Sequence, residues 1–291
     1  MMSFPQTTGP LTPADHDRVL RAFSRSSYAH VHYDWRTLEE WLPHPDLRAF
    51  VCRQNDTIRA LVGATVHAGA KPGQPPFAWL RFILPASTAP ERESTLQALW
   101  EALQANLRAE GVGQVALLEL DGWTGILVNH WGFEHTNGVI TLKRRRGEIP
   151  PVREPYSVRE VEAAEEMARI ADLDAAAFDP PWVYGLDTLM VAQQYASTLT
   201  VIEEEGEMLG YQLSTQHGLD GHLARLAVLP RLQGHGLGGM LIGEMVHFFA
   251  RRGVHTITVN TQEDNVHSQH LYERLGFART GHSVPVWMLT L

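Results

Sequence analysis

The order of apolar and polar positions along this 291-residue chain occurs twice. In the first half, an apolar strand ending in proline (Phe82–Ser87) precedes a helical pattern at Thr95–Gly111. In the second half, a similar strand at Ala227–Leu232 precedes a helical pattern at Gly239–Gly253. Both helical patterns end at glycine, as helix C-termini commonly do. The pattern predicts a tandem duplication of one fold.

The repeated order continues beyond each helical pattern. A short β-rich run comes next in both halves, and each half then closes on a Gly-Phe pair, Gly132-Phe133 in the first and Gly276-Phe277 in the second. Between the halves, Lys143–Pro155 is polar, contains prolines and has no periodicity, which is typical of a linker. We therefore predict two domains, at residues 1–146 and 152–291.

The second half gives the clearest series of elements. A helical pattern at Ala163–Phe178 and a loop at Asp179–Thr188 come first. A hairpin follows at Thr198–Thr215 and turns near Gly206, and the next strand, Gly221–Val228, leads into a glycine-rich loop. Together with the later helix and strand they predict an α/β fold with a mixed sheet and helices on both faces.

Four glycines stand at the start of the Gly239–Gly253 helical pattern: Gly234, Gly236, Gly238 and Gly239. A helix start carries unpaired N–H groups and a partial positive charge, and glycines let the oxygens of an anion reach those groups. The loop therefore predicts a phosphate or pyrophosphate cradle, and a tight turn without a ligand is the simpler alternative.

Two common phosphate motifs fit this loop less well. A nucleotide-triphosphate loop ends in Gly-Lys-Ser/Thr, whereas Gly239-Met240 follows Gly238 here. A dinucleotide fingerprint needs an acidic residue at the end of the next strand, where this chain has Asn260-Thr261. A dinucleotide-dependent oxidoreductase stays open as an alternative.

Two motifs in the second half resemble signatures of the GNAT superfamily of N-acyltransferases. The first is V-x-P-x-x-Q-G-x-G-x-G from Val228 to Gly238, and the second is N-x-x-x-x-x-x-L-Y-x-x-x-G-F from Asn265 to Phe277. They occur in the family's order and at the expected distance, and they cover roughly Val152–Leu291. The first half shares the resemblance only through the repeat.

The resemblance implies two tandem GNAT-like domains, each with a mixed, mostly antiparallel sheet flanked by helices. It implies acetyl-CoA as co-substrate and Tyr272 as the acid that protonates the leaving thiolate. The implied cofactor-binding residues are Ala227, Val228, Gln233, Gly234, His235, Gly236, Leu237, Gly238, Gly239, Asn265 and Tyr272.

The expected function is transfer of an acetyl group from acetyl-CoA to a primary amine of a small molecule or peptide by direct attack in a ternary complex. The amine must lose a proton, and His222, with the same strand parity as Val228, is the first candidate for the base. Asp220 and Glu203, at adjoining strand ends, are the other candidates. In the second half, the loop that follows the helical pattern Ala163–Phe178 supplies Asp179, Trp182 and Tyr184 as candidate substrate-binding residues. A non-catalytic CoA-binding sensor is the other alternative.

The first half has the pattern without these residues. In register with the repeat, Thr88 and Ala89 stand opposite Gln233 and Gly234, and Pro90 and Glu91 follow them. A carboxylate at a pyrophosphate cradle repels the ligand, and proline lacks an N–H group. The first domain is therefore predicted to be a degenerate copy without a cofactor motif.

Net charge and cysteine content limit the kinds of partner and metal site that this chain is expected to have. The formal charge of −9 argues against general nucleic-acid binding, and one cysteine permits neither an internal disulfide nor a thiolate metal cluster. No apolar run reaches transmembrane length, and the N-terminal segment lacks the features of a signal peptide. We expect a cytoplasmic enzyme without a metal, acting as a monomer or a homodimer.

Overall fold

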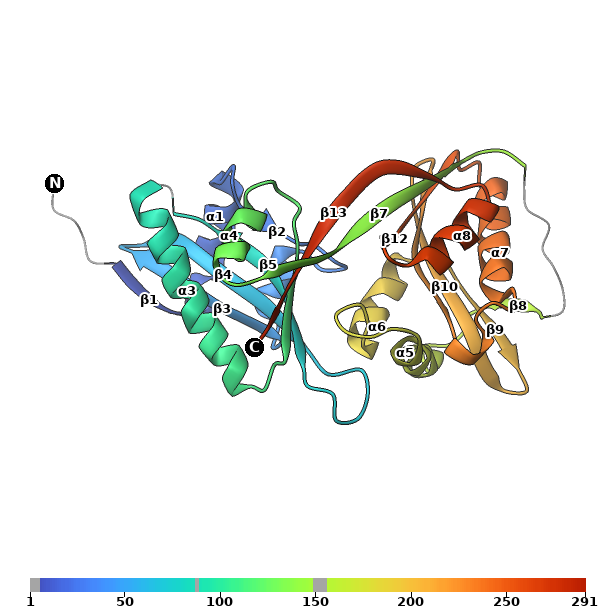
Figure 1. Ribbon diagram of the computed structural model, residues 1–291, viewed down its shortest axis with the longest axis horizontal. Helices are drawn as coiled ribbons and strands as arrows, with labels where there is room; N and C mark the ends of the chain where they lie inside the picture. The colour runs from blue at the N-terminus through green and yellow to red at the C-terminus, as the bar shows by residue number, and fades with distance from the viewer. Residues whose placement is uncertain (1–5, 87–88, 149–155) are drawn as a thin grey trace. The chain divides into compact units, whose positions relative to one another are not determined.

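Two units divide the chain in the computed structural model (Figure 1). Unit 1 contains Met1–Thr136 and Pro285–Leu291, and unit 2 contains Asn137–Val284. The structure describes residues 6–86, 89–148 and 156–291, and for residues 89–91 it describes the backbone only. No helix in these ranges combines the length and apolar content that crossing a bilayer requires.

In unit 1 the sheet has the strand order β1-β3-β4-β5-β6-β13, and β2 pairs with β5. The β5–β6 pair is parallel, while β1–β3, β3–β4, β4–β5 and β6–β13 are antiparallel. The elements of this unit are β1 (Gln6–Pro10), η1 (Pro13–Asp15), α1 (His16–Arg25), β2 (His30–Val31), α2 (Leu38–Trp41), β3 (Leu47–Gln54), β4 (Thr57–His67), β5 (Phe77–Leu84), α3 (Ala89–Ala109), β6 (Gln114–Leu118) and α4 (Thr124–His130).

In unit 2 the sheet has the order β8-β9-β10-β11-β12-β7-β13, with a parallel β11–β12 pair. Figure 1 shows α5 and α6 on one face of β10 and α7 on the other. The elements are β7 (Glu134–Arg145), β8 (Val158–Glu160), α5 (Glu166–Ala177), α6 (Leu186–Tyr195), β9 (Thr198–Glu204), β10 (Glu207–His217), β11 (Asp220–Val228), η2 (Pro230–Leu232), α7 (Leu237–Arg251), β12 (Thr256–Gln262), α8 (Val266–Arg274) and β13 (Ala278–Thr290).

Alternating side chains explain why each sheet is covered on both faces. On β3, Val51 packs with α1 and α2 while its neighbour Cys52 packs with α3. On β5, Phe82 and Ile83 divide in the same way between these two clusters. A strand with period-two alternation whose two faces are both apolar needs helices on both sides. The predicted mixed sheet flanked by helices is confirmed in each unit.

The two units do not follow a single boundary in chain order. Strand β7 begins in unit 1 and continues into unit 2, and β13 runs from unit 2 into unit 1. The last residues of the chain therefore complete the sheet of unit 1, where Trp287 pairs with Leu117 on β6. The indole N–H of Trp287 donates to Glu119 Oε2 at 2.8 Å.

The basic run at the predicted linker is part of the fold. Lys143–Arg145 belong to β7, and Arg144 pairs with Ile257 on β12. The Arg144 side chain is buried and donates from Nε to the Leu275 carbonyl at 2.9 Å, at the end of α8. The predicted linker, Lys143–Pro155, was therefore wrong at its start, where three residues belong to a strand and Arg144 is buried. Residues 149–155 of the predicted linker lie outside the described residues.

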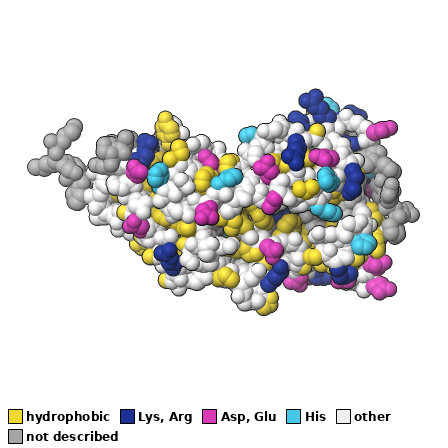
Figure 2. Space-filling model, in the orientation of Figure 1, with side chains coloured by type: hydrophobic (Ala, Val, Ile, Leu, Met, Phe, Trp, Pro, Cys, Tyr) yellow, Lys and Arg dark blue, Asp and Glu magenta, His cyan; other side chains and the backbone are white. Residues whose placement is uncertain are grey.

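The visible surface carries no segregation of charge. Figure 2 shows acidic and basic side chains scattered over this face, with apolar side chains between them. The formal net charge of the whole chain is −9. A long polyanion finds no continuous basic stripe on this face.

Trp287→Ala tests the assignment of the chain's end to unit 1. The substitution removes a half-buried indole that packs on the core of unit 1, and we expect a loss of about 2 kcal/mol in the stability of that unit. Hydrogen exchange should accelerate in β4–β6 and remain unchanged in β9–β11. Thr290→Ala, an exposed change on the same strand, is the control. Equal acceleration in both units would contradict the assignment.

Candidate functional site

A pocket of about 460 Å³ lies in unit 2 between the end of β11, the start of α7 and the start of α8. Its volume falls within the range of about 300–1,000 Å³ that is usual for small-molecule sites. The pocket brings together most of the predicted residues, namely Asp179, Trp182, Ala227, Val228, Gln233, Gly234, Gly236, Leu237, Gly238, Gly239 and Asn265. Tyr184, His222, His235 and Tyr272 are not among its lining residues.

The start of α7 points unpaired donors at this pocket. Met240 makes the first helical hydrogen bond, to the Gly236 carbonyl at 3.1 Å. The N–H groups of Leu237, Gly238 and Gly239 precede it and have no acceptor within the helix. No side chain caps this start, because the N-cap residue is Gly236. The positive end of the helix dipole therefore faces a cavity, which is the arrangement that binds anions.

The four glycines of the loop have different reasons to be glycine. Gly234 and Gly236 have φ of 82° and 93°, a left-handed backbone that other residues rarely adopt. A Cβ on Gly238 would meet Leu271 Cδ2 at 3.0 Å, so close packing of α7 on α8 accounts for that glycine. A Cβ on Gly239 would meet nothing closer than 3.9 Å. Only Gly239 lacks a structural reason, and it lines the pocket.

One edge of β11 is open beside the pocket. The parallel pairing of β11 with β12 runs from Asp220↔Thr256 to Leu223↔Val259 and ends there. On its other side β11 stays paired with β10 as far as Gly210↔Val228. The last five residues of β11 therefore have strand neighbours on one side only, and the open edge can hydrogen-bond an extended ligand with amide groups.

Asn265 begins α8 at the rim of the pocket. Its Oδ1 accepts from the Ser268 N–H at 3.1 Å as the helix N-cap. The side chain thus fixes the start of α8, and its predicted role in holding the cofactor stays a prediction. His235, predicted to contact phosphate, is exposed, and its Nδ1 lies 3.1 Å from the Gln233 carbonyl within the loop.

Sequence reasoning missed several lining residues. Asn137 reaches the pocket from β7, far away in the chain, and no local motif marks it. Four others lie within or beside the second predicted motif and could have been found from their helical positions relative to Asn265: Asp264, His267, Ser268 and Arg274.

Tyr272 is 5% exposed and belongs to the apolar cluster between α7, β12 and α8. Its ring lies 5.8 Å from that of Phe277. Burial raises the pKa of the phenol well above its usual value, and the charge of Arg225 acts in the opposite direction. At neutral pH the hydroxyl is protonated, which a general acid requires, and its role as that acid stays a prediction.

His222 lies one residue before β11 separates from β12. Its Nδ1 is 2.8 Å from the Thr258 hydroxyl, and burial lowers the pKa of the imidazole. The parity argument that placed it beside Val228 does not hold, because the β10–β11 register shifts at Leu213/Ser214. Leu223 and Val228 both pack on the α7 face, so the His222 side chain points to the opposite face.

A buried charge network supports the predicted substrate loop from that opposite face. Asp174 on α5 is fully buried and accepts from Arg225 Nε and Nη2, both at 2.7 Å. Tyr211 donates its hydroxyl to the same carboxylate, and Arg225 Nη2 also donates to the Trp182 carbonyl at 2.7 Å. Burial opposes the charge of Arg225, but the Asp174 carboxylate offsets it and the pKa of Arg225 is raised.

The same guanidinium lies between two aromatic rings. Arg225 Cζ is 3.6 Å from the ring centroid of Phe178 and 4.1 Å from that of Tyr184. The Tyr184 N–H donates to Asp174 Oδ1 at 2.7 Å. A cation of the protein itself thus contacts the Tyr184 ring, while Trp182 and Asp179 line the pocket. The structure favours Asp179 and Trp182 over Tyr184 as groups that an acceptor could contact.

The corresponding part of unit 1 differs in its described residues. Asp121, aligned with Asn265, accepts a hydrogen bond from Nδ1 of the buried His30 at 2.8 Å, and Val128, aligned with Tyr272, lies in the core. Thr88 lies outside the described residues, and the side chains of residues 89–91 are not described. The loss of the cradle in unit 1 therefore stays a prediction.

Comparison with known proteins agrees with this geometry. The family model described as "Acetyltransferase (GNAT) family" matches residues 167–277. A [ribosomal protein bS18]-alanine N-acetyltransferase of Haemophilus influenzae is 25% identical over 120 residues, covering 41% of this chain and 80% of the relative. A mycothiol acetyltransferase of Mycobacteroides abscessus is 25% identical over 240 residues, covering 73% of this chain and 81% of the relative.

A solved structure resembles the chain along its length. It is described as a tandem GNAT protein from the clavulanic acid biosynthesis pathway, and it has a TM-score of 0.62, 14% identity and 98% coverage of both chains. The predicted tandem GNAT-like architecture is thereby confirmed as a fold.

Gly239→Glu tests the cradle without straining the backbone. Gly239 has neither a positive φ nor a close neighbour, so the helix should form, and a carboxylate in its first turn suits the dipole. We expect acetyl-CoA affinity to fall at least about 100-fold, since a charge now opposes the pyrophosphate where donors had met it. Gly239→Gln, whose side chain has the size of glutamate but no charge, should lose distinctly less affinity for acetyl-CoA. Equal losses in calorimetric titrations would show that bulk alone is responsible.

Arg225→Lys tests the network under the loop. Lysine can neither form the bidentate pair with Asp174 nor stack between Phe178 and Tyr184. We expect a loss of about 3 kcal/mol in chemical denaturation, the range for breaking a buried pair. In the fraction that is folded, the KM for the amine should rise while acetyl-CoA affinity stays nearly constant. Arg231→Lys, at an exposed ion pair, is the control. An unchanged KM would restrict the network to stability.

Proposed function

We propose that the second half of the chain, in which residues 167–277 match the family model described as "Acetyltransferase (GNAT) family", moves an acetyl group from acetyl-CoA to a primary amine of a small molecule or peptide. The observation that carries the proposal is the meeting of two features in one pocket. An uncapped helix start offers donors to a pyrophosphate, and the open edge of β11 offers hydrogen-bonding groups to an extended, amide-bearing arm.

These two features fit acetyl-CoA better than a dinucleotide. The pantetheine arm of coenzyme A contains amides that an unpaired strand edge can bind, whereas a dinucleotide has no such chain. The dinucleotide alternative also needs an acidic residue at the end of the next strand, and β12 ends in Asn260, Thr261 and Gln262. We therefore assign the N–H groups from Leu237 to Gly239 to the pyrophosphate and residues 224–228 to the arm.

The reaction requires a neutral amine and a stable leaving group. The amine nitrogen attacks the thioester carbonyl carbon, the C–S bond breaks, and the amine loses a proton while the sulfur gains one. An alkylamine with a pKa near 10.4 is only about 0.1% neutral near pH 7.4, so a base or a water chain must accept the proton. A backbone N–H on the open part of β11, near Val228, is our candidate for the donor to the carbonyl oxygen.

His222 and Tyr272 are the proposed base and acid. The lowered pKa of His222 keeps its imidazole neutral at pH 7, so it can accept a proton through Nε2 while Nδ1 faces Thr258. The raised pKa of Tyr272 keeps its proton until a strongly basic thiolate develops. Asp179 and Trp182 are proposed to contact the acceptor, because a carboxylate and an indole ring together suit an organic cation.

The relatives suggest two types of acceptor. One relative is named for an alanine of a ribosomal protein, and others are named for mycothiol. Both names describe acetyl transfer, so the panel of amines for this chain should contain N-terminal alanyl peptides and amino sugars bearing thiols. The cytoplasmic location and the oligomeric state stay predictions.

Calorimetric titration with acetyl-CoA and NADPH, followed by thiol release with the amine panel, tests the proposal. We expect acetyl-CoA to bind, NADPH not to bind, and at least one amine to accelerate thiol release and appear as an amide by mass spectrometry. Acetyl-CoA binding with no turnover for any amine would favour the non-catalytic sensor. NADPH binding without acetyl-CoA binding would overturn the assignment.

Tyr272→Phe tests the acid. The substitution deletes one hydroxyl and keeps the ring that packs on Phe277, so the melting temperature and acetyl-CoA affinity should change little. We expect kcat to fall roughly 100-fold or more, in the range typical of losing a general acid. The loss should be smaller for thioesters with a more acidic leaving thiol, which needs less help to depart.

One control variant and two possible outcomes separate the acid from a structural role. Phe277→Tyr adds a hydroxyl to the neighbouring ring without removing the one on Tyr272. A Tyr272→Phe enzyme with near-normal kcat would reduce Tyr272 to a core residue, and so would a parallel loss of binding and melting temperature.

A further inference from the structure

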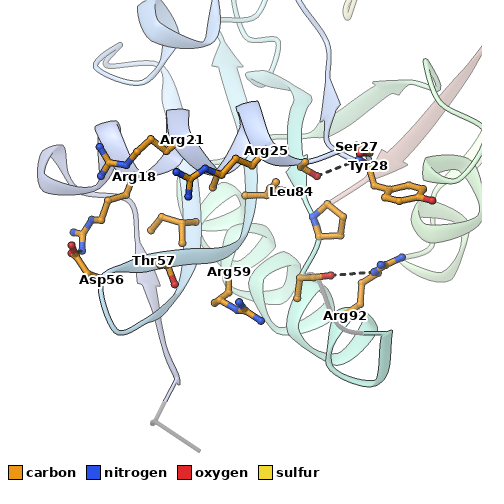
Figure 3. A pocket seen from close by; sticks show the side chains of 15 residues that line it. Arg18, Arg21, Arg25, Ser27, Tyr28, Asp56, Thr57, Arg59, Leu84 and Arg92 are labelled. Carbon is orange, nitrogen blue, oxygen red and sulfur yellow. Dashed lines mark hydrogen bonds and ion pairs between the residues drawn. The ribbon is translucent and has the colours of Figure 1, made fainter.

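Unit 1 contains a second pocket, about 480 Å³ in volume, on elements that the proposed reaction does not use. It lies between α1, the start of β4 and the end of β5, and Arg92 of α3 closes one side (Figure 3). Its volume nearly equals that of the pocket in unit 2, and its lining chemistry is different. Five arginines and a single carboxylate line it: Arg18, Arg21, Arg25, Arg59, Arg92 and Asp56.

Three of the arginines form a row on α1. Arg18, Arg21 and Arg25 are three and four residues apart, which places them on one helix face, and Figure 3 shows them along the same side of the pocket. Like charges at these spacings destabilise a helix. The helix dipole favours Arg25 in the last turn, but it gives no reason for Arg59 and Arg92, which come from β4 and α3.

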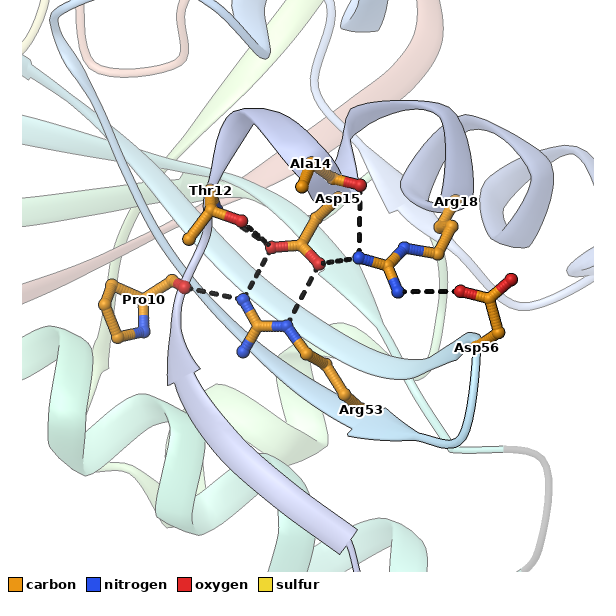
Figure 4. A network of polar contacts seen from close by, with 7 residues as sticks. All are labelled: Pro10, Thr12, Ala14, Asp15, Arg18, Arg53 and Asp56. Atoms are coloured by element: carbon orange, nitrogen blue, oxygen red, sulfur yellow. Dashed lines mark hydrogen bonds and ion pairs between the residues drawn. The ribbon is translucent and has the colours of Figure 1, made fainter.

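Arg18 is held in place by a carboxylate network (Figure 4). Its Nη2 donates to Asp15 Oδ1 at 2.9 Å, and its Nη1 donates to Asp56 at 3.0 Å. Asp15 is fully buried and also accepts from Arg53 Nε at 3.0 Å. The hydrogen bonds from Arg53 and Thr12 keep the pKa of Asp15 well below its usual value, so the carboxylate stays charged. The guanidinium of Arg18 is thus positioned before any ligand arrives.

Arg92 is also oriented by the protein. Its Nε donates to the Ala86 carbonyl at 3.2 Å, and its Cζ lies 5.7 Å from the ring centroid of Tyr28. Arg21 and Arg25, in contrast, are exposed and make no ion pair with any described carboxylate. The pocket therefore combines two fixed guanidinium groups with two that extend into solvent.

We propose that this pocket binds a small oligophosphate anion, of the size of a nucleotide or less. Arginine forks match the oxygens of a phosphate group, and several around one cavity suit an ion with several charges. The lining also includes apolar surface from Ile58, Leu84 and Pro85, which suits an organic group attached to the phosphates. A long nucleic acid is disfavoured, because the chain as a whole carries a formal charge of −9.

The pocket is separate in place from the cradle of unit 2. Both include a strand end and the beginning of the following helix, but the unit 2 pocket continues to β12 and α8. The unit 1 pocket continues along α1 and to the β3–β4 turn at Asp56. The proposed ligand thus has its own site, and the proposal stands whether or not unit 2 transfers acetyl groups.

Calorimetric titration of the full chain with inorganic tripolyphosphate tests the proposal. The cradle of unit 2 also attracts phosphates, so the titration is done in the wild type and in Gly239→Glu. The variant that removes the site is Arg21→Gln/Arg25→Gln, because neither residue holds another part of the described structure. Its control, Arg108→Gln/Arg145→Gln, removes two exposed arginines outside the pocket and changes the net charge equally.

We expect binding in Gly239→Glu to fit a single site, and this binding should weaken at least about tenfold when Arg21 and Arg25 are replaced, as loss of charge-assisted contacts implies. The control should stay within about twofold. Arg25→Gln alone gives an intermediate loss if the double variant does not fold. Parallel titrations with ATP and with CoA identify the source of the phosphates: tighter binding of either supports an organic phosphate, and binding of tripolyphosphate alone supports the free anion.

Three results would overturn the proposal. Binding that disappears in Gly239→Glu would place the anion in unit 2. Binding that Arg21→Gln/Arg25→Gln leaves unchanged would exclude the arginine pocket. An equal loss in the control pair would reduce the effect to net charge.

Discussion

The parting of β11 from β12 is the constraint on which the site depends. Where two parallel strands stay paired, the backbone N–H and C=O groups on their facing edges bond one another, and none is left there for a ligand. Here the ladder stops at Leu223↔Val259, while β10 holds the other side of β11 to its end. The open edge leads directly to η2 and the start of α7, where three N–H groups lack helical acceptors. One interrupted ladder thus places an open strand edge and an uncapped helix start beside a single pocket.

An open strand edge needs support from behind, and the Arg225–Asp174 pair supplies it. Arg225 stands on the part of β11 that has left β12, and its guanidinium ties that strand to α5 through Asp174 and to the following loop through the Trp182 carbonyl. An unpaired charge at this depth would be costly, so both partners must stay in place together. The network therefore fixes the strand that the cofactor is proposed to bind and the loop that is proposed to meet the acceptor.

Local features of this site could be predicted from the sequence, whereas features that depend on distant pairing could not. The glycine loop is local, because a left-handed backbone at Gly234 and Gly236 and an uncapped helix leave a direct trace in residue type. The place of Asn137 in the pocket has no such local signal in the sequence, because Asn137 reaches the pocket only through the pairing of β7 with β12. The face of His222 was mispredicted because a register shift on β10–β11 changes the alternation, and period-two counting assumes an unbroken ladder. The place of Trp287 was hidden for a similar reason, since the strand that carries it passes from one unit to the other.

The two units are proposed to hold different ligand chemistry on one fold. In unit 2 the groups proposed to bind an anion are backbone N–H donors at a helix start that no side chain caps, in a loop rich in glycine. In unit 1 the corresponding positions carry proline and glutamate, and the positive groups stand on side chains around a neighbouring pocket instead. Backbone N–H donors have fixed positions and so fit one arrangement of pyrophosphate oxygens, whereas guanidinium groups on flexible side chains can adjust to several arrangements of negative charge. A chain with both would bind its reacting anion tightly in one unit and respond to a more variable anion in the other.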